Sequence, residues 1–194
     1  MNYLAHLFLA DTSDEFMIGS FLGDFVKGSI GDQFSPEIST GIKFHRKVDI
    51  YADAHKKTVA SRNLFSREKR RFAGIILDIC YDHFLSKHWS EYSDIALPQF
   101  IDHVYDLLQK YQDIFPERLK SVLPLLISQN WLGTYMSLKG VEITLNRIAK
   151  RISRKNSLEG SVSEIRSNYD DLESNFLAFF PDLVVFAKSF IREM

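Results

Sequence analysis

Polar side chains lie on one face of each of two stretches that are expected to form amphipathic helices, at positions where apolar side chains are usual. The first face consists of Ile38, Ile42, His45, Asp49, Ala52 and Asp53. The second consists of Phe72, Ile75, Ile79, Asp82, His83 and Ser86, with Asp78 one turn before Asp82. Residues three and four apart are neighbours on a helix surface. His45 with Asp49, and Asp78 with Asp82, therefore each project two polar groups from adjacent turns.

A buried carboxylate without a partner is unfavourable by several kcal/mol, so buried acids are expected to be paired or to bind a metal. A polar network joining helices would explain either pair alone. Two pairs together with His6, which lies among leucines, and Asp24, which lies between Phe21 and Phe25, favour a site. The sequence therefore predicts a metal site inside a helical protein.

The whole chain of 194 residues is expected to form one all-α domain, residues 1–194. Apolar residues make up 45% of it, which suits one globular core. Period-two alternation is scarce, and no Asn-Gly or Asp-Gly hairpin signal occurs. Pro36, Pro98 and Pro116 fit helix starts. The expected helices are 2–10, 13–28, 36–61, 66–90, 98–113, 116–129, 140–153, 161–179 and 181–192, with a polar, flexible connection at 153–163.

Charge is unevenly distributed along the chain. The net charge of −1 gives no general case for binding nucleic acid. Residues 43–71 nevertheless contain ten Lys and Arg against three acids, whereas residues 1–42 contain one base and six acids. The basic band suits an anionic substrate or an acidic partner, and it equally suits an ordinary solvated surface.

Several features point to a cytoplasmic protein without membrane insertion. Cys80 is the only cysteine, so no intramolecular disulfide can form, and its apolar neighbours predict a core position. The apolar N-terminal stretch is interrupted by His6 and Asp11 and lacks a basic region, unlike a signal peptide. No uncharged run approaches the ~18 residues that span a bilayer.

The residue types of the predicted site suit a hydrolytic metal ion. Imidazole with carboxylate suits Mn²⁺, Fe²⁺ and Zn²⁺, whereas carboxylate with water suits Mg²⁺. Some of the acids can instead orient ligating imidazoles. Other sites lack their motifs: there is no phosphate-binding loop, no dinucleotide fingerprint, no nucleophile elbow, and no Glu three residues before His45 or His83. The aromatic side chains of Phe176, Phe179, Phe180 and Phe186 are spaced for core packing.

Four motifs resemble those of the acyl carrier protein phosphodiesterase family. They are Asn2-Tyr3-Leu4-Ala5-His6, Gly23-Asp24-Phe25-Val26-Lys27-Gly28, His45-Arg46-Lys47-Val48-Asp49 with Asp53, and Asp82-His83-Phe84-Leu85 with Trp89. They occur in order across the first ninety residues and are specific only together. Members of the family often show Asp-x-His-Pro after the third motif, where this chain has Lys56 in place of the proline.

The resemblance implies hydrolysis of the phosphodiester that joins 4′-phosphopantetheine to a serine of holo-acyl carrier protein. The products would be apo-acyl carrier protein and 4′-phosphopantetheine. It also implies an acidic protein partner, a Mn²⁺ or Mg²⁺ cofactor, and a fold like that of the HD phosphohydrolases, which are helical proteins with His/Asp metal sites. The chain has Asp82-His83 rather than His-Asp, so ligands cannot be copied from the HD motif.

The predicted roles fall into four groups. The candidate metal ligands are His6, Asp24, His45, Asp78, Asp82 and His83. The candidate catalytic residues are Asp24, His45 and Asp49. The candidate phosphate or substrate contacts are Lys27, Arg46 and Lys47. The candidate contacts to the carrier protein are Lys56, Lys57, Arg67, Lys69, Arg70 and Arg71. Two other functions stay open, an HD-like phosphohydrolase of a small nucleotide and a non-catalytic helical module that docks an acidic partner.

Overall fold

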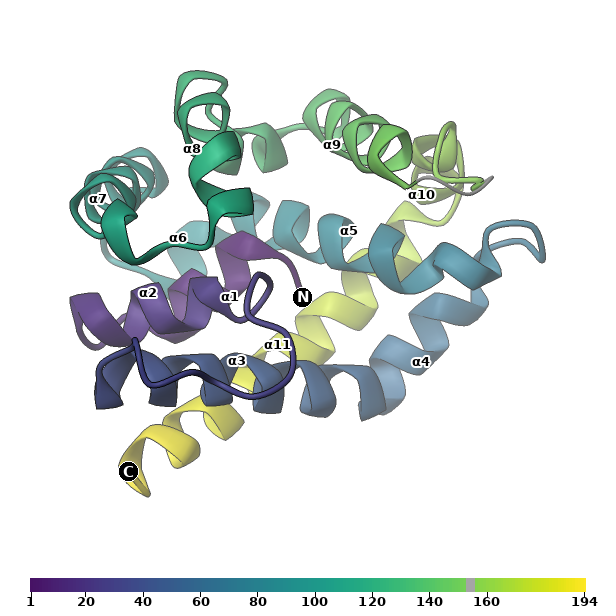
Figure 1. The fold of residues 1–194 in the computed structure, drawn as a ribbon. Helices are drawn as coiled ribbons and strands as arrows, with labels where there is room; N and C mark the ends of the chain where they lie inside the picture. Colours follow the sequence, from purple (N-terminus) through teal and green to yellow (C-terminus); the bar gives the residue numbers. More distant parts are fainter. Residues whose placement is uncertain (153–155) are drawn as a thin grey trace.

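A computed structural model of the chain, which describes residues 1–152 and 156–194, is built from helices and contains no strand in those ranges (Figure 1). This confirms the all-α prediction. The α-helices are α1 Tyr3–Leu9, α2 Asp14–Leu22, α3 Pro36–Ala54, α4 Lys56–Asn63, α5 Ala73–Lys87, α6 Trp89–Tyr92, α7 Leu97–Lys110, α8 Glu117–Ser128, α9 Leu138–Arg151, α10 Ser161–Ser167 and α11 Tyr169–Arg192. Short 3₁₀ turns occur at Arg70–Phe72, Gln112–Ile114 and Leu132–Met136.

Helices α2 and α3 start where the sequence predicts and pack closely along their length. Ser13 and Ser35 cap them, because each hydroxyl accepts a backbone N–H three residues later at 3.2 Å. Gly19 of α2 faces Gly41 of α3, and a Cβ on Gly19 would lie 2.2 Å from the carbonyl oxygen of Ile38. Only glycine allows this approach, which brings the end of α2 against the middle of α3.

The predicted helix 36–61 is wrong in one respect, because it is broken at His55. This residue has an extended backbone, with ψ of 134°, and separates α3 from α4. Its Nδ1 accepts the backbone N–H of Lys57 at 3.2 Å, and its Nε2 lies 3.3 Å from a carboxylate oxygen of Asp182 in α11. The imidazole therefore caps α4 and ties the break to the last helix.

The predicted break at Pro181 is also wrong, because α11 runs without interruption from Tyr169 to Arg192. The preceding break lies at Asn168, between α10 and α11. Proline removes one helical hydrogen bond, but Phe176, Phe179 and Phe180 hold α11 in the core. These three aromatics confirm the core prediction, whereas Phe186 is only half-buried.

Two other expected helices are shorter than predicted. The expected helix 13–28 ends at Leu22, and the expected helix 66–90 begins only at Ala73, after a 3₁₀ turn. The end of the expected helix 140–153 and part of the expected connection 153–163 lie outside the described residues. Cys80 is buried and free, as predicted.

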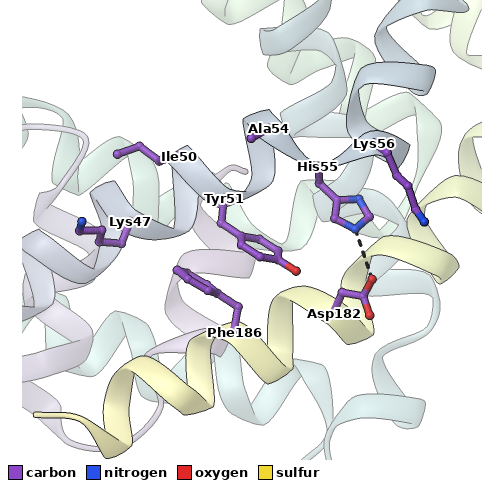
Figure 2. Close-up of a pocket in the computed structure, with 8 residues that line it drawn as sticks. All are labelled: Lys47, Ile50, Tyr51, Ala54, His55, Lys56, Asp182 and Phe186. Carbon is purple, nitrogen blue, oxygen red and sulfur yellow. Dashed lines mark hydrogen bonds and ion pairs between the residues drawn. The ribbon is translucent and has the colours of Figure 1, made fainter.

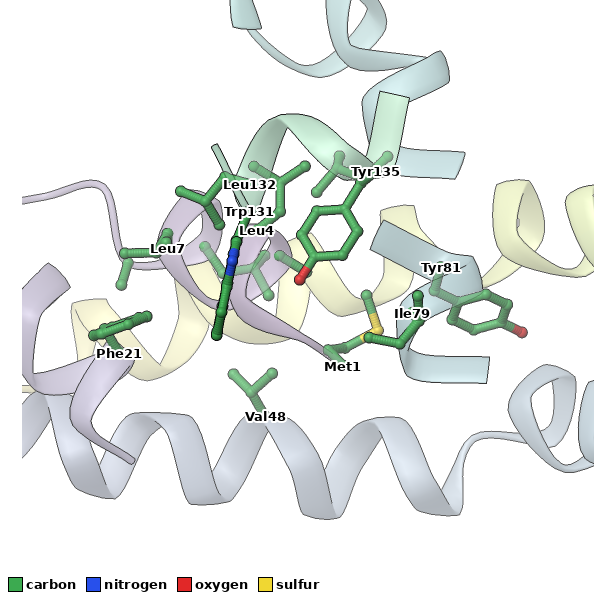
Figure 3. Close-up of a cluster of buried hydrophobic side chains, with 14 of the residues drawn as sticks. Met1, Leu4, Leu7, Phe21, Val48, Ile79, Tyr81, Trp131, Leu132 and Tyr135 are labelled. Carbon is green, nitrogen blue, oxygen red and sulfur yellow. The ribbon is translucent and has the colours of Figure 1, made fainter. Parts of the chain in front are cut away.

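One continuous set of buried side chains links the helices around α1. Figure 3 shows Met1, Leu4 and Leu7 beside Trp131 and Tyr135. Helix α1 is thus surrounded by the rest of the chain, and most of its side chains are buried.

Helix α11 is long and apolar enough to cross a membrane, judged by length and composition alone. Its mean hydropathy is 1.3, and 28% of the apolar window is buried.

Asp82 of α5 fixes the start of α1. Its side chain is fully buried and accepts the backbone N–H groups of Leu4 at 2.8 Å and Ala5 at 3.3 Å. Burial raises the pKa of Asp82 to about 7, although the two N–H donors act in the opposite direction. Asp82 therefore satisfies two of the N–H groups that a helix start leaves unpaired.

Replacing Asp82 with Ala is expected to lower the free energy of unfolding by about 2–4 kcal/mol, because two buried N–H groups lose their acceptor. Asp82→Asn retains the size and one acceptor oxygen, so its loss should be smaller. Urea unfolding followed by circular dichroism measures both. Equal stability of wild type and Asp82→Ala would contradict the capping role.

Candidate metal centre

His6, His45 and Asp49 converge at one point between α1 and α3. The Nε2 atom of His6 lies 3.0 Å from Asp49 Oδ1, and the Nε2 atom of His45 lies 3.2 Å from Asp49 Oδ2. The two imidazole rings stack with their centroids 3.7 Å apart and their planes 18° apart. Both histidines are buried, whereas the Asp49 side chain is 40% exposed. The cluster therefore opens to solvent on the Asp49 side.

Asp24 lies beside this cluster, in the segment that follows α2. Its Oδ1 is 3.9 Å from His45 Nε2. The neighbouring Gly23 packs directly on the His45 ring, since a Cβ at Gly23 would lie 2.2 Å from His45 Cγ. The close packing of α2 on α3 thus brings Asp24 and His45 together although they are 21 positions apart in the sequence.

The backbone amino group of Met1 and the carboxylate of Asp78 complete the surroundings. The Met1 nitrogen lies 3.0 Å from Asp78 Oδ1 and 3.5 Å from Asp49 Oδ1. Burial alone would lower the pKa of this amino group, but the two carboxylates raise it to about 11. The ammonium is therefore a positive charge held between two of the predicted site acids.

The charge states of the cluster suit metal ligation. Burial lowers the pKa of His6 to about 3, and the neighbouring His45 adds to this effect. Burial would raise the pKa of Asp49, but hydrogen bonds from His45 and His6 hold it well below its usual range. Metal ligands are neutral imidazoles and ionised carboxylates. Near neutral pH, His6 and Asp49 are already in these forms.

The three side chains of the cluster also have potential ligand atoms close to one another. One potential ligand atom each from His6, His45 and Asp49 lies within 4.8 Å of the others. Ligand atoms about 2.1 Å from one ion lie roughly 3–4 Å apart, so small side-chain shifts suffice. The Nδ1 atoms of His6 and His45 are buried without a hydrogen-bond partner in the described ranges. The polar contacts of both rings are thus directed at the Asp49 carboxylate.

Not all of the predicted ligands are brought together. Asp82 is turned toward the start of α1, as described above. Nδ1 of His83 lies 2.7 Å from the carbonyl oxygen of Tyr135, and Nε2 lies 2.9 Å from the Tyr169 hydroxyl. Asp78 and Asp82, one turn apart on α5, thus contact different groups. The structure groups His6, His45 and Asp49 with Asp24 and Asp78, and it leaves Asp82 and His83 outside.

Two of the predicted substrate contacts lie at the segment that follows α2, and the third lies elsewhere on α3. Lys27 is exposed in the segment after α2. Arg46 donates a hydrogen bond of 2.9 Å from Nη2 to the carbonyl oxygen of Val26, so it holds the segment that carries Asp24. Lys47 is exposed on the outer face of α3, where it borders a groove against α11.

The predicted contacts to a protein partner are also dispersed. Lys56 lies at the start of α4 and borders the same groove as Lys47. Lys57 is half-buried, and Arg67, Arg70 and Arg71 are exposed near the start of α5. Lys69 instead donates hydrogen bonds to the carbonyl oxygens of Ser157 and Glu159, which fixes it to the segment before α10.

Sequence reasoning missed the Met1 amino group and two arginines of α9. Arg147 and Arg151 border a small cavity of about 30 Å³ together with Asn2 and Tyr3, and the Arg147 guanidinium lies 4.0 Å from the centroid of the Trp131 ring. Neither arginine has an ion pair within the described ranges. The sequence does show that Arg147 and Arg151 are one turn apart on an amphipathic helix. It does not show that they lie beside Asn2 and Tyr3 of the first motif, because that closeness depends on the fold.

Comparison with known proteins decides the family. The family profile described as acyl carrier protein phosphodiesterase matches residues 1–183. The chain belongs to this family. Curated relatives with the same name include that of Photorhabdus laumondii, which is 37% identical over 93% of this chain and 92% of the relative. That of Yersinia enterocolitica is 37% identical over 95% of this chain and 96% of the relative. The relative from an Escherichia coli O6:H1 strain is 35% identical over 95% of this chain and 96% of the relative. No solved structure matches the chain significantly.

Proposed function

We propose that this protein is a metal-dependent phosphodiesterase that hydrolyses holo-acyl carrier protein to apo-acyl carrier protein and 4′-phosphopantetheine. The proposal rests on one observation above all, the convergence of His6, His45 and Asp49 in a member of the acyl carrier protein phosphodiesterase family. The family name gives the substrate, and the cluster gives the groups that a hydrolytic cation requires. A cytoplasmic location, where this substrate would be met, belongs to the same proposal.

His6, His45 and Asp49 are the residues that would hold Mn²⁺ or Mg²⁺, with Asp24 and Asp78 beside them. When bound, such an ion would neutralise charge on the phosphodiester and lower the pKa of a coordinated water. The sequence-based ligands Asp82 and His83 are not part of this proposal, because their polar atoms are engaged elsewhere.

Asp24 is proposed as the group that accepts a proton from the attacking water. Its carboxylate lies at the edge of the cluster, and burial raises its pKa toward the range in which a carboxylate is an effective base. Attack at phosphorus breaks the bond to the serine oxygen, which leaves as the serine hydroxyl after gaining a proton. The phosphate remains on the pantetheine, which accounts for both products.

The direct test is mass spectrometry of holo-acyl carrier protein after incubation with the protein and Mn²⁺. We expect the carrier protein to lose the mass of 4′-phosphopantetheine with gain of water, and free 4′-phosphopantetheine to appear. Turnover of a panel of nucleotides without any change in the carrier protein would favour a nucleotide phosphohydrolase instead.

Replacing Gly23 with Ala is expected to lower turnover by about 10- to 100-fold, because displacement of a catalytic group by about 1 Å has effects of this size. The new methyl group would overlap the His45 ring. Gly74→Ala is the matched control, since its Cβ would meet nothing closer than 3.8 Å, at the Arg62 side chain. Steady-state kinetics of both variants, with circular dichroism to check folding, measures the effect. Equal kinetics of the two would show that the close packing on His45 is unimportant.

A further inference from the structure

A groove of about 610 Å³ lies between the end of α3 and the second half of α11 (Figure 2). Its walls come from α3, from the start of α4 and from α11. The lining residues are Lys47, Ile50, Tyr51, Ala54, His55, Lys56, Asp182 and Phe186. The proposed catalytic cluster uses none of these residues.

The floor of the groove is apolar and open to solvent. The Tyr51 and Phe186 rings stack with their centroids 4.3 Å apart and their planes 15° apart, and Ile50 is 65% exposed beside them. Helix α11 is apolar over a window of which only 28% is buried. Exposed apolar surface that the core does not require is characteristic of an interaction site.

The two ends of the groove are positively charged. Figure 2 shows Lys47 at one end and Lys56 at the other, and neither ammonium has an ion pair within the described part of the chain. The one carboxylate of the groove, Asp182, lies 3.3 Å from Nε2 of His55. The groove therefore offers an apolar floor between two free positive charges.

We propose that this groove is the docking site for an acidic amphipathic helix of the acyl carrier protein, an inference that rests on the function proposed above. Lys47 lies on α3 about 10 Å of helix before its end at Ala54, and Lys56 begins α4 after the extended residue His55. A docked helix would carry an acid toward each of the two lysines, with an apolar side chain between the acids that covers Tyr51 and Phe186. The acidic partner implied by the family complements this pattern.

The position of the groove suits delivery of the phosphodiester to the catalytic cluster. Asp49 and Ile50 are consecutive residues of α3, so their side chains leave the helix about 100° apart. One points to His6 and His45, and the other borders the groove. A carrier protein bound in the groove would therefore lie on the face of α3 that adjoins the cluster.

The experiment measures binding separately from turnover by using apo-acyl carrier protein, which contains no bond to hydrolyse. Isothermal titration calorimetry compares wild type, Ile50→Asp and the double variant Lys47→Glu with Lys56→Glu. Leu125→Asp is the matched control, because Leu125 is a 50% exposed apolar residue of α8, away from the groove. The kcat/KM of each protein for holo-acyl carrier protein is measured in parallel.

Ile50→Asp and the double variant are each expected to weaken apo-acyl carrier protein binding by at least ~10-fold, with a matching fall in kcat/KM, whereas Leu125→Asp has no effect. Unchanged binding in both groove variants overturns the proposal. A dimer in sedimentation that Ile50→Asp dissociates would assign the groove to a second copy of the chain and overturn the proposal. Loss of binding to phospholipid vesicles alone in the groove variants would assign the groove to a lipid surface and overturn it as well. If wild type binds apo-acyl carrier protein through the groove without hydrolysing the holo form, the proposed function fails while the docking site stands.

Discussion

Replacing His45 with Ala is expected to lower turnover of holo-acyl carrier protein by at least ~100-fold, because the change removes a proposed metal ligand and releases Asp49 on one side. Asp49→Ala should have an effect of similar or larger size, since Asp49 contacts both imidazoles. Turnover by Asp24→Ala should also fall by at least ~100-fold, because this variant lacks the proposed proton acceptor at the cluster. Steady-state kinetics with saturating Mn²⁺ measures the three variants.

The matched control is His103→Ala, which removes an exposed imidazole of α7 far along the chain from the cluster. It should retain normal turnover. Circular dichroism and urea unfolding establish that each variant is folded, because His45 is buried and its truncation leaves a void. Near-normal turnover of folded His45→Ala and Asp24→Ala would assign these residues to a structural polar network.

The sequence predicts the parts of the fold that depend on nearby residues. The starts of α2 and α3 are correct because Ser13 and Ser35 need only a backbone N–H three residues away. The break at His55 escapes prediction because it involves Asp182, a residue 127 positions away. The continuity of α11 through Pro181 likewise depends on core packing rather than on the local sequence.

The candidate site likewise contains contacts that the sequence predicts and contacts that depend on the fold. The spacing of His45 and Asp49 on one helix is visible in the sequence, and the structure places their side chains 3.2 Å apart. Asp78 and Asp82 have the same spacing, yet Asp78 contacts the Met1 amino group and Asp82 caps α1. Helical spacing predicts which residues share a face. What each side chain contacts depends on the helix that packs against that face. The closeness of His6 to Asp49, 43 positions apart, required the fold.

Removing divalent cations is expected to lower turnover by at least ~100-fold, because the proposed mechanism depends on an ion held by His6, His45 and Asp49. Activity after dialysis against a chelator, followed by return of Mn²⁺ or Mg²⁺, measures the loss and its recovery. Full activity in a protein shown by elemental analysis to contain no metal would falsify the metal-dependent mechanism.

Metal binding should also be visible without turnover. A ligand that binds only the folded state stabilises it by about 2.7 kcal/mol at a hundred times its Kd, which for a chain of this size corresponds to a rise in Tm of roughly 5–10 °C. Thermal unfolding of the chelated protein with and without Mn²⁺ measures this shift. His45→Ala and Asp49→Ala should lose most of it, whereas Asp82→Asn and His103→Ala should retain it, since neither Asp82 nor His103 lies in the cluster. A shift that is unchanged in His45→Ala and Asp49→Ala would mean that the ion binds elsewhere on the chain.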